Sequence, residues 1–210
     1  MRVPALRVLT ALAAIGCAAF AIWRGAAVAS FGLAEIEGAS AETAPRLDAW
    51  VRVPGIAGLA LDVALAAPTD PRDAAAVRRH LEEANALAAV RPASPRAWLL
   101  VAGARYVAAR PTPDVLSALR LSDRTGANEG ALMLERGIFG LVIWTALPED
   151  LRRRTASDIA VALAETSVED KDLTPAREVL AAASAATRED VAARLRAQGV
   201  LPGDLKRMGL

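Results

Sequence analysis

The feature that most constrains the fold of this chain is a recurring residue pair, a capping residue followed by proline, in front of apolar stretches with helical periodicity. The pairs are Asp70-Pro71, Ser94-Pro95, Thr112-Pro113 and Thr174-Pro175, and Leu147-Pro148 repeats the pattern without a good capping residue. A Ser, Thr or Asp side chain at the N-cap accepts a hydrogen bond from the first helical turn, and proline at the next position needs no N–H partner. The pattern predicts a series of short helices joined by tight turns.

The stretches between these pairs support helices and no other regular element. No stretch alternates like a half-buried strand, and no Asn-Gly or Asp-Gly turn lies between apolar runs. Alanine, the strongest helix former, dominates the apolar residues. We therefore predict an all-α fold, an antiparallel helical array, with helices over residues 71–91, 95–109, 113–124, 128–146, 148–167, 175–186 and 188–198.

An uncharged apolar segment lies near the N-terminus, at residues 8–23, and Arg2 and Arg7 precede it. Its sixteen residues span about 24 Å as a helix, and including residues 5–7 brings it close to the ~30 Å of a bilayer core. Two interpretations fit. One is a single-pass anchor with a cytoplasmic N-terminus, spanning the membrane through residues 5–23. The other is a signal peptide cleaved at the Ala27-x-Ala29 sequence.

Both interpretations place the rest of the chain outside the cytoplasm. The expected location is the inner membrane, with the C-terminal domain in the periplasm, or alternatively the periplasm after cleavage. The segment before residue 70 holds a possible helix over 47–51 and a modest one over 56–67. The predicted organisation is an anchor or signal segment (1–24), a membrane-proximal linker with short helices (25–69), a helical domain (70–199) and a C-terminal tail (200–210).

Composition argues against several function classes. The formal net charge is only +1, which argues against nucleic-acid binding through a broad basic field. His80 is the only histidine and Cys17 the only cysteine, so neither a typical zinc site nor an intramolecular disulfide is expected. His80 is expected to be solvated. No nucleotide-binding or hydrolase motif occurs, so we expect no cofactor and no enzymatic activity.

A weak internal repeat runs through the helical domain. Residues 84–106 align with residues 117–139 at an offset of 32–33, which brings Tyr106 over Phe139. An offset of this size is typical of helix-pair repeats. The first unit has Leu99, Gly103 and Tyr106 at the large, small and aromatic spacing of a first repeat helix.

On these residues the chain resembles the tetratricopeptide-repeat family over residues 72–167. The phrase at residues 118–123, ALRLSD, is similar to the close of that family's second helix. The segment between Tyr106 and Ala118 is shorter than the family's, and Arg136 stands at the small-residue position of the second unit, where we expect it to hinder close helix packing. The alternative is an irregular α-bundle.

The resemblance implies a concave groove that binds a peptide or a partner helix, without catalysis. We expect Arg105, Tyr106, Arg136 and Phe139 to line this groove, since related positions of the two units would share one surface. The protein also resembles small membrane-anchored accessory proteins of bacterial envelope polysaccharide systems, through RPASPRAWLLVAG and LRLSDRTGANEGALMLER. We predict a membrane-tethered interaction or assembly module in envelope biogenesis.

Other interpretations remain open. Glu149-Asp150 is an acidic pair that fits a first helical turn, but a cell-wall glycan hydrolase using Glu149 is an alternative. A third interpretation is a structural subunit of an integral membrane complex. The Arg152–Arg154 run is expected to be a solvated helix face, because the acidic pair partly cancels its charge. Trp50 is expected at a membrane or partner surface.

Overall fold

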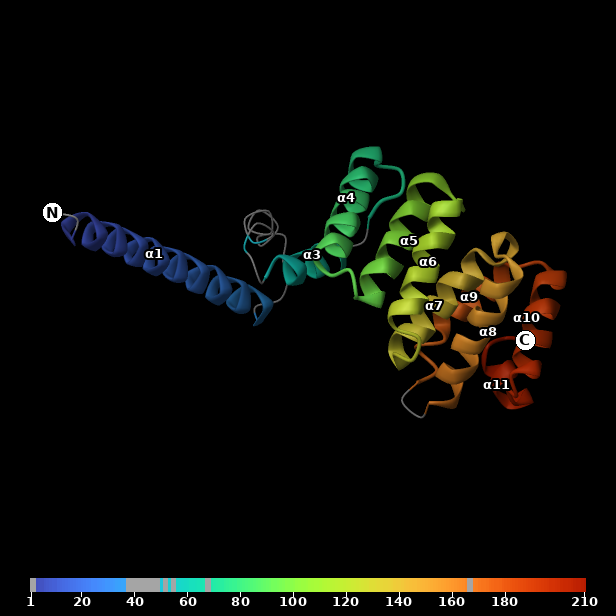
Figure 1. Ribbon diagram of the computed structural model, residues 1–210. Coiled ribbons are helices and arrows are strands. Elements are labelled where there is room, and N and C mark those ends of the chain that lie inside the picture. Colours follow the sequence, from blue (N-terminus) through green and yellow to red (C-terminus); the bar gives the residue numbers. More distant parts are fainter. Residues whose placement is uncertain (1–2, 37–49, 51–52, 54–55, 67–68, 166–167) are drawn as a thin grey trace.

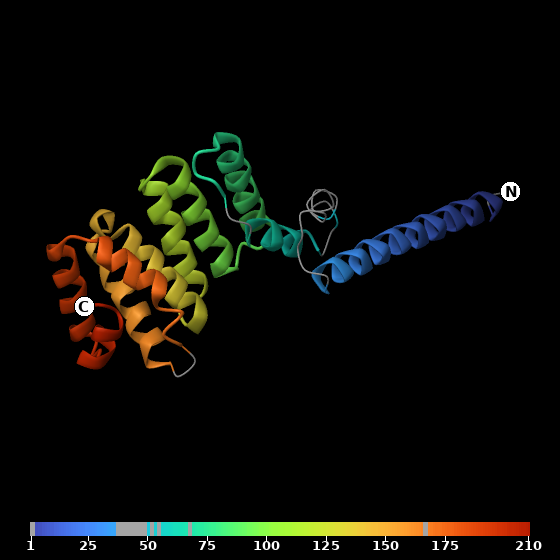
Figure 2. The ribbon, with the colours of Figure 1, turned by 180° about the vertical axis from the view of Figure 1, so that it is seen from behind.

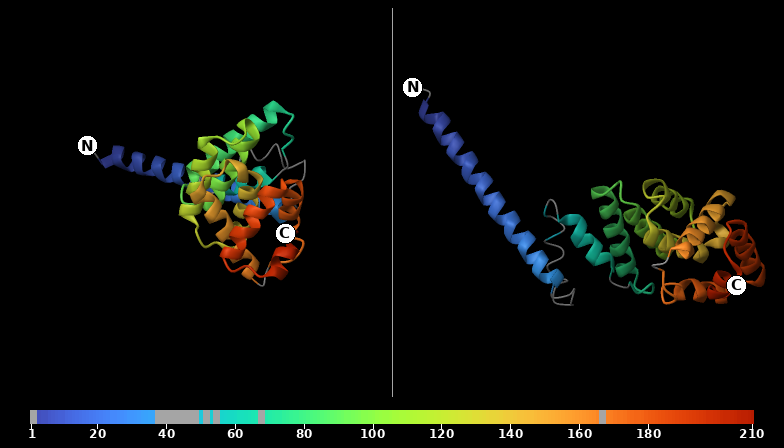
Figure 3. Two further views of the ribbon diagram at one scale, coloured as in Figure 1. Left: turned by 90° about the vertical axis from the view of Figure 1, so that its right-hand side faces the viewer. Right: turned by 90° about the horizontal axis from the view of Figure 1, so that it is seen from below.

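The computed structural model describes residues 3–36, 50, 53, 56–66, 69–165 and 168–210, and every regular element in these ranges is helical. The all-α prediction is therefore confirmed for the described part of the chain. One long helix, α1, projects away from a stack of shorter helices, with the N-terminus at its far end (Figures 1 and 3). Residues 37–49 of the predicted linker (25–69) lie outside the described residues, as does the expected helix over 47–51 apart from Trp50.

Helix α1 (Val3–Ile36) has 34 residues, about 51 Å at 1.5 Å per residue. It is continuous through the predicted anchor, through the possible cleavage site and past the predicted boundary at residue 24. Alanine-rich sequence after Gly25 favours helix strongly enough to carry it over two glycines. Residues Leu12–Ser30 of this helix are long and apolar enough to span a membrane, and they are not buried by the rest of the protein.

The remaining helices pair and stack. Helix α3 packs across α4, helices α5 and α6 and helices α7 and α8 form two antiparallel hairpins, and α9 packs on α7 while α10 packs on α8 (Figures 1 and 2). Successive pairs thus lie side by side in two helical layers. The bounds are α3 (Ala57–Ala66), α4 (Ala74–Val90), α5 (Pro95–Ala109), α6 (Pro113–Thr125), α7 (Gly130–Val142), a 3₁₀ turn η1 (Trp144–Ala146), α8 (Glu149–Ala164), α9 (Thr174–Ala182), α10 (Ala185–Ala197) and α11 (Pro202–Arg207).

Two of the predicted helix starts are confirmed with their caps. The Ser94 hydroxyl accepts a hydrogen bond from the Ala97 N–H at 3.3 Å, and α5 begins at Pro95. The Thr112 hydroxyl accepts one from the Val115 N–H at 3.4 Å, and α6 begins at Pro113. Each cap supplies an acceptor to a turn whose N–H groups have no partner within the helix.

Two predicted caps are wrong. The Asp70 carboxylate accepts from the Arg72 N–H and closes a turn, and Asp73 caps α4 three residues later. Asp73 has the extended backbone that a cap requires, and its oxygen accepts two N–H groups of the first turn. Thr174 lies inside α9 rather than before it, and its side chain does not cap the helix.

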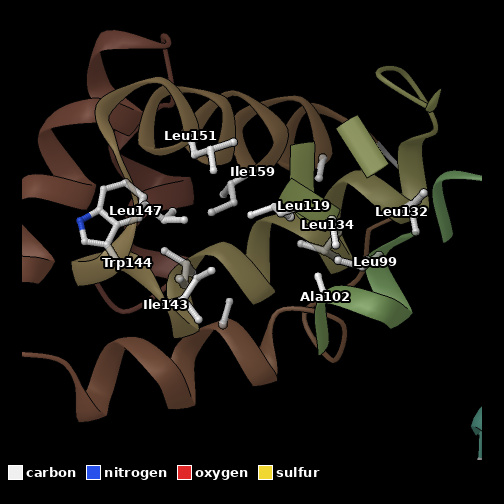
Figure 4. Close-up of a cluster of buried hydrophobic side chains, with 14 of the residues drawn as sticks. Leu99, Ala102, Leu119, Leu132, Leu134, Ile143, Trp144, Leu147, Leu151 and Ile159 are labelled. Carbon is white, nitrogen blue, oxygen red and sulfur yellow. The ribbon is translucent and has the colours of Figure 1, made fainter. Parts of the chain in front are cut away.

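The core follows the interface between the two layers. Leucine, isoleucine and alanine side chains from α5 to α8 converge there, among them Leu119, Leu134 and Ile159 (Figure 4). Helices α7 and α8 approach closely at Gly137 and Gly140, where an added Cβ would lie 2.6 Å from an Ile159 side-chain carbon and 2.3 Å from the Thr155 hydroxyl. Arg136 therefore does not prevent close packing of α7 against α8, although we expected it to hinder such packing.

The C-terminal segment belongs to the folded array. The sequence predicts a tail over 200–210, but α11 forms there, and Leu205 and Met208 are buried in the main core. Pro202 at the first turn starts this helix in the way that the other proline positions do. The prediction of a tail was wrong because so short a helix is anchored by a few apolar residues close to the chain end, Leu205 and Met208, which leave no clear periodic pattern in the sequence.

Candidate partner-binding surface

The structure brings together two of the four residues expected in the groove. Tyr106 on α5 and Phe139 on α7 pack edge to face, with ring centroids 6.0 Å apart and an interplanar angle of 85°. This is a favourable geometry for two aromatic rings. Positions that the repeat alignment places together therefore lie side by side on adjacent hairpins. Both residues remain partly exposed.

One arginine at the end of α5, Arg110, lies beside this aromatic pair, whereas Arg105 contacts the start of α6. A guanidinium N–H of Arg105 donates to the backbone carbonyl of Asp114 at 3.1 Å. The guanidinium carbon of Arg110 lies 5.9 Å from the centroid of the Tyr106 ring, within the range of a cation–π interaction. The sequence reasoning missed Arg110, although its spacing of four residues from Tyr106 near a helix end was a usable signal.

Arg110 has an unusual backbone conformation. Its φ is 65° and its ψ is −173°, and it is the one non-glycine residue with positive φ in the described part of the chain. This region is occupied almost only by glycine, and holding another residue there costs on the order of 1–3 kcal/mol. The Arg110 N–H still makes the last helical hydrogen bond, to the Tyr106 carbonyl at 2.8 Å, and the non-helical dihedral angles of Arg110 then end α5.

Arg136 does not line this surface, and its assignment to the groove is wrong. It is only 2% exposed, and its guanidinium forms two hydrogen bonds to Asp158, of 2.6 and 3.0 Å. It also donates to the carbonyls of Ser122 and Gly126, at 3.4 and 3.1 Å. A buried guanidinium needs such partners. They lie on α6, directly after α6 and on α8, rather than on α5.

The partners of Arg136 form a small buried ion cluster. Asp158 also lies 3.2 Å from Arg154, and Asp123 lies 2.6 Å from Arg154 and 3.8 Å from Arg136. Two cations and two carboxylates leave the cluster neutral. Burial raises the pKa of Asp158, against the opposing effect of the Arg136 guanidinium. Because the cluster connects α6, α7 and α8 inside the array, we assign it to the stability of the fold.

The basic run on α8 is largely occupied by contacts within the protein. Arg152 donates to the carbonyl of Trp144 and lies 3.8 Å from Asp190, and Arg154 belongs to the buried cluster. Only Arg153 is strongly exposed, with 69% of its side chain accessible. The prediction of a fully solvated face is therefore wrong for two of the three arginines.

The acidic pair at the start of α8 is bound by arginines. Glu149 accepts two hydrogen bonds from Arg194, of 2.8 and 2.9 Å, and Asp150 is paired with Arg120. These hydrogen bonds lower the pKa of both carboxyls. A glycosidase general acid needs a raised pKa so that it carries a proton near neutral pH. The geometry thus favours a structural role for the pair.

Trp50 is buried, and the expectation that it is exposed at a surface is wrong. Only 5% of it is accessible, and its Nε1–H donates to the Ser30 hydroxyl at 3.0 Å. It packs in a small cluster with Val53, Ile56 and Ala60, against which Ala27 of α1 also lies. This cluster joins α1 to the helical array.

His80 is partly buried on α4, and burial lowers its pKa below the ordinary value, so it is not the fully solvated residue expected. Within the described residues, His, Cys, Asp and Glu side chains form no group of three placed to hold a metal ion. Comparison of the chain with protein-family models, with curated proteins and with solved structures gives no match.

Proposed function

We propose that this protein is a membrane-tethered interaction or assembly module whose helical array works outside the cytoplasm, as an accessory factor in envelope or polysaccharide biogenesis. One observation carries the proposal. A long apolar helix with an exposed surface is joined to a stack of helical hairpins that presents partly exposed aromatic and arginine side chains. The resemblance to tetratricopeptide repeats, which bind partner segments, supports the same function.

The membrane assignment is supported by the surface of α1. Its large apolar side chains between Leu12 and Val28 are exposed, including Phe20 (51%) and Trp23 (48%). A soluble protein rarely exposes so continuous an apolar surface, whereas a bilayer would cover it. Arg2 and Arg7 at the N-terminal end favour a cytoplasmic N-terminus.

The connection between anchor and array also supports a tether. Helix α1 is about 51 Å long and exceeds a ~30 Å hydrocarbon core, so part of it extends beyond the membrane. If residues 5–23 span the membrane, Ser30 lies about 10 Å beyond Trp23. The Ser30–Trp50 hydrogen bond then holds the array next to the membrane surface.

Topology and partner binding can be tested together in the full-length protein. We expect carbonate-resistant membrane association and a C-terminal reporter active only in the periplasm. We also expect Tyr106→Ala to weaken recovery of crosslinked partners, and the matched exposed change Val90→Ala (53% accessible, on α4) to leave it unchanged. Equal recovery with both folded variants would argue against the α5–α7 surface.

The hydrolase interpretation has a direct test in the same protein. Release of muropeptides from cell-wall glycan by the purified chain, abolished in Glu149→Gln, would overturn the proposal. The third interpretation, a structural subunit, requires specific contacts of α1 inside the membrane. Full function after replacement of residues 5–23 by an unrelated anchor would eliminate it.

A further inference from the structure

The aromatic pair on α5 and α7 belongs to a larger surface that combines apolar and cationic side chains. Val107 and Val142, which are 35 residues apart near the ends of α5 and α7, are 43% and 42% exposed. We call this the arginine–aromatic surface, and it consists of Tyr106, Val107, Arg110, Phe139 and Val142. Arg105 lies outside it, because residues two apart along a helix, such as Arg105 and Val107, point to opposite sides, and the Arg105 guanidinium reaches the start of α6.

An apolar groove continues this surface toward α9. Val142 lies one helical turn beyond Phe139, and it also lines a groove of about 370 Å³ between the end of α7 and α9. Trp144, Val179 and Ala182 line the same groove. An apolar side chain of a bound segment could therefore lie in the groove while its neighbours lie over the aromatic pair.

The cation of this surface, Arg110, has no ionic partner among the residues that the structure describes. Neither Arg105 nor Arg110 forms an ion pair with a carboxylate of the described residues. Two carboxylates near this surface along the sequence are candidates for such an ion pair. Asp114 meets Arg105 through its backbone carbonyl instead, and Glu135 lies one turn before Phe139 on α7. Arg154 on α8 and Arg194 on α10, by contrast, are paired with carboxylates, as in Arg194 with Glu149.

The backbone at Arg110 indicates that its side chain is needed. Glycine would occupy φ 65° and ψ −173° without strain and would end α5 equally well. Strain of this kind is retained where the surrounding structure or the function requires the residue. The side chain of Arg110 is exposed and lies against the Tyr106 ring, so packing in the core does not explain the strain.

We propose that the arginine–aromatic surface binds a partner protein segment that carries carboxylate side chains next to aliphatic or aromatic ones. The Arg110 guanidinium supplies the complementary charge, and the aromatic pair and the groove supply the apolar contact. This inference rests on the proposed function and names the chemistry of the partner. Because the Arg110 cation lies beside the Tyr106 ring, the surface discriminates in favour of a segment with both features.

The test uses a photoreactive amino acid in place of Val107 in the full-length protein, in native membranes. The matched control sites are Val90 on α4 and Leu201 before α11, which are 53% and 67% exposed. Crosslinked peptides are sequenced by mass spectrometry. We expect a protein adduct at Val107 whose crosslinked segment is rich in Asp or Glu and contains apolar residues.

Charge variants then test the complementarity. We expect Arg110→Glu to lower the Val107 crosslink yield by about tenfold or more, and Arg110→Lys to retain most of it. Arg110→Gly should raise Tm by roughly 2–4 °C, because the strain is relieved, while lowering the crosslink yield. A simultaneous gain in Tm and loss of crosslink separates binding from folding.

Several results would overturn the inference. They are a yield insensitive to charge reversal, a crosslinked segment rich in Lys or Arg, or an adduct that is lipid, glycan or a second copy of this chain. Protein adducts at Leu201 or Val90 with none at Val107 would overturn the inference and leave the proposed function standing. The absence of protein adducts at all three sites would overturn both.

Discussion

The buried ion cluster yields a sharp prediction about the stability of the array. Asp158→Asn keeps the shape of the side chain and removes its charge, which leaves the buried Arg136 cation without its principal partner. Asp158 and Arg136 are 1% and 2% exposed, and two hydrogen bonds join them. Breaking a buried pair from one side costs about 3–5 kcal/mol. Asp123 remains 3.8 Å from Arg136 and partly compensates, so we expect a loss of about 3 kcal/mol in the free energy of unfolding.

Removing both charges should cost less than removing one. In Arg136→Met with Asp158→Leu no uncompensated charge remains, and such replacements are often neutral. The carbonyls of Ser122 and Gly126 lose their arginine donor, however, at about 1 kcal/mol each. We therefore expect the double variant to be about 1–2 kcal/mol less stable than wild type and more stable than Asp158→Asn.

Urea unfolding of the full-length protein in detergent micelles, followed by tryptophan fluorescence, measures these differences, provided the m-values agree. Asp150→Asn is the matched control, because it breaks an ion pair whose side chains are 39% and 56% exposed, and it should change stability by less than about 1 kcal/mol. The reasoning is refuted if Asp158→Asn costs no more than Asp150→Asn, or if the double variant is less stable than the single one.

Three further predictions concern packing, pH and the junction with α1. Gly140→Ala should destabilise the array by about 1–3 kcal/mol in thermal melts, because the new methyl overlaps α8, whereas Gly103→Ala, with open space around it, should be neutral or slightly stabilising. Burial lowers the pKa of His80, so as the pH falls below about 6.5 the histidine is protonated in the unfolded chain before it is protonated in the folded protein. The free energy of unfolding should therefore drop between about pH 7.5 and pH 5.5, and a His80→Gln variant should show a smaller drop. Trp50→Phe, which loses the hydrogen bond to α1, should broaden the distance distribution between spin labels on the native Cys17 and on α4; an unchanged distribution would show that the bond does not hold the junction.

The predictable parts of this fold are those that a few neighbouring residues determine. The caps at Ser94 and Thr112 depend on a side chain and an N–H group within three residues, and both were found from sequence. The Asp70 cap failed for a local reason as well. Asp73 lies three residues further along and competes for the same role, and apolar periodicity is too coarse to decide between two candidates one turn apart.

The residues assigned wrongly are those whose partners lie far along the chain. Arg136 meets Asp158 across 22 residues, and Trp50 meets Ser30 across 20 residues, so neither pairing leaves a local pattern. An arginine at an expected surface position and one inside a buried cluster look the same in the sequence. By contrast, the repeat offset did place Tyr106 near Phe139, because stacked hairpins convert a sequence period into a spatial neighbour.

Arginines of the array fall into paired and unpaired ones, and the difference bears on function. Arg120 on α6, Arg154 on α8 and Arg194 on α10 bind carboxylates, as does the buried Arg136 on α7. Arg110 at the end of α5 lies beside the Tyr106 ring and forms no ion pair with a carboxylate of the described residues. Paired guanidiniums add little to the attraction of a distant polyanion, whereas an unpaired one beside an apolar patch acts at short range. The distribution therefore favours recognition of a short mixed-character segment over binding of a uniformly charged polymer.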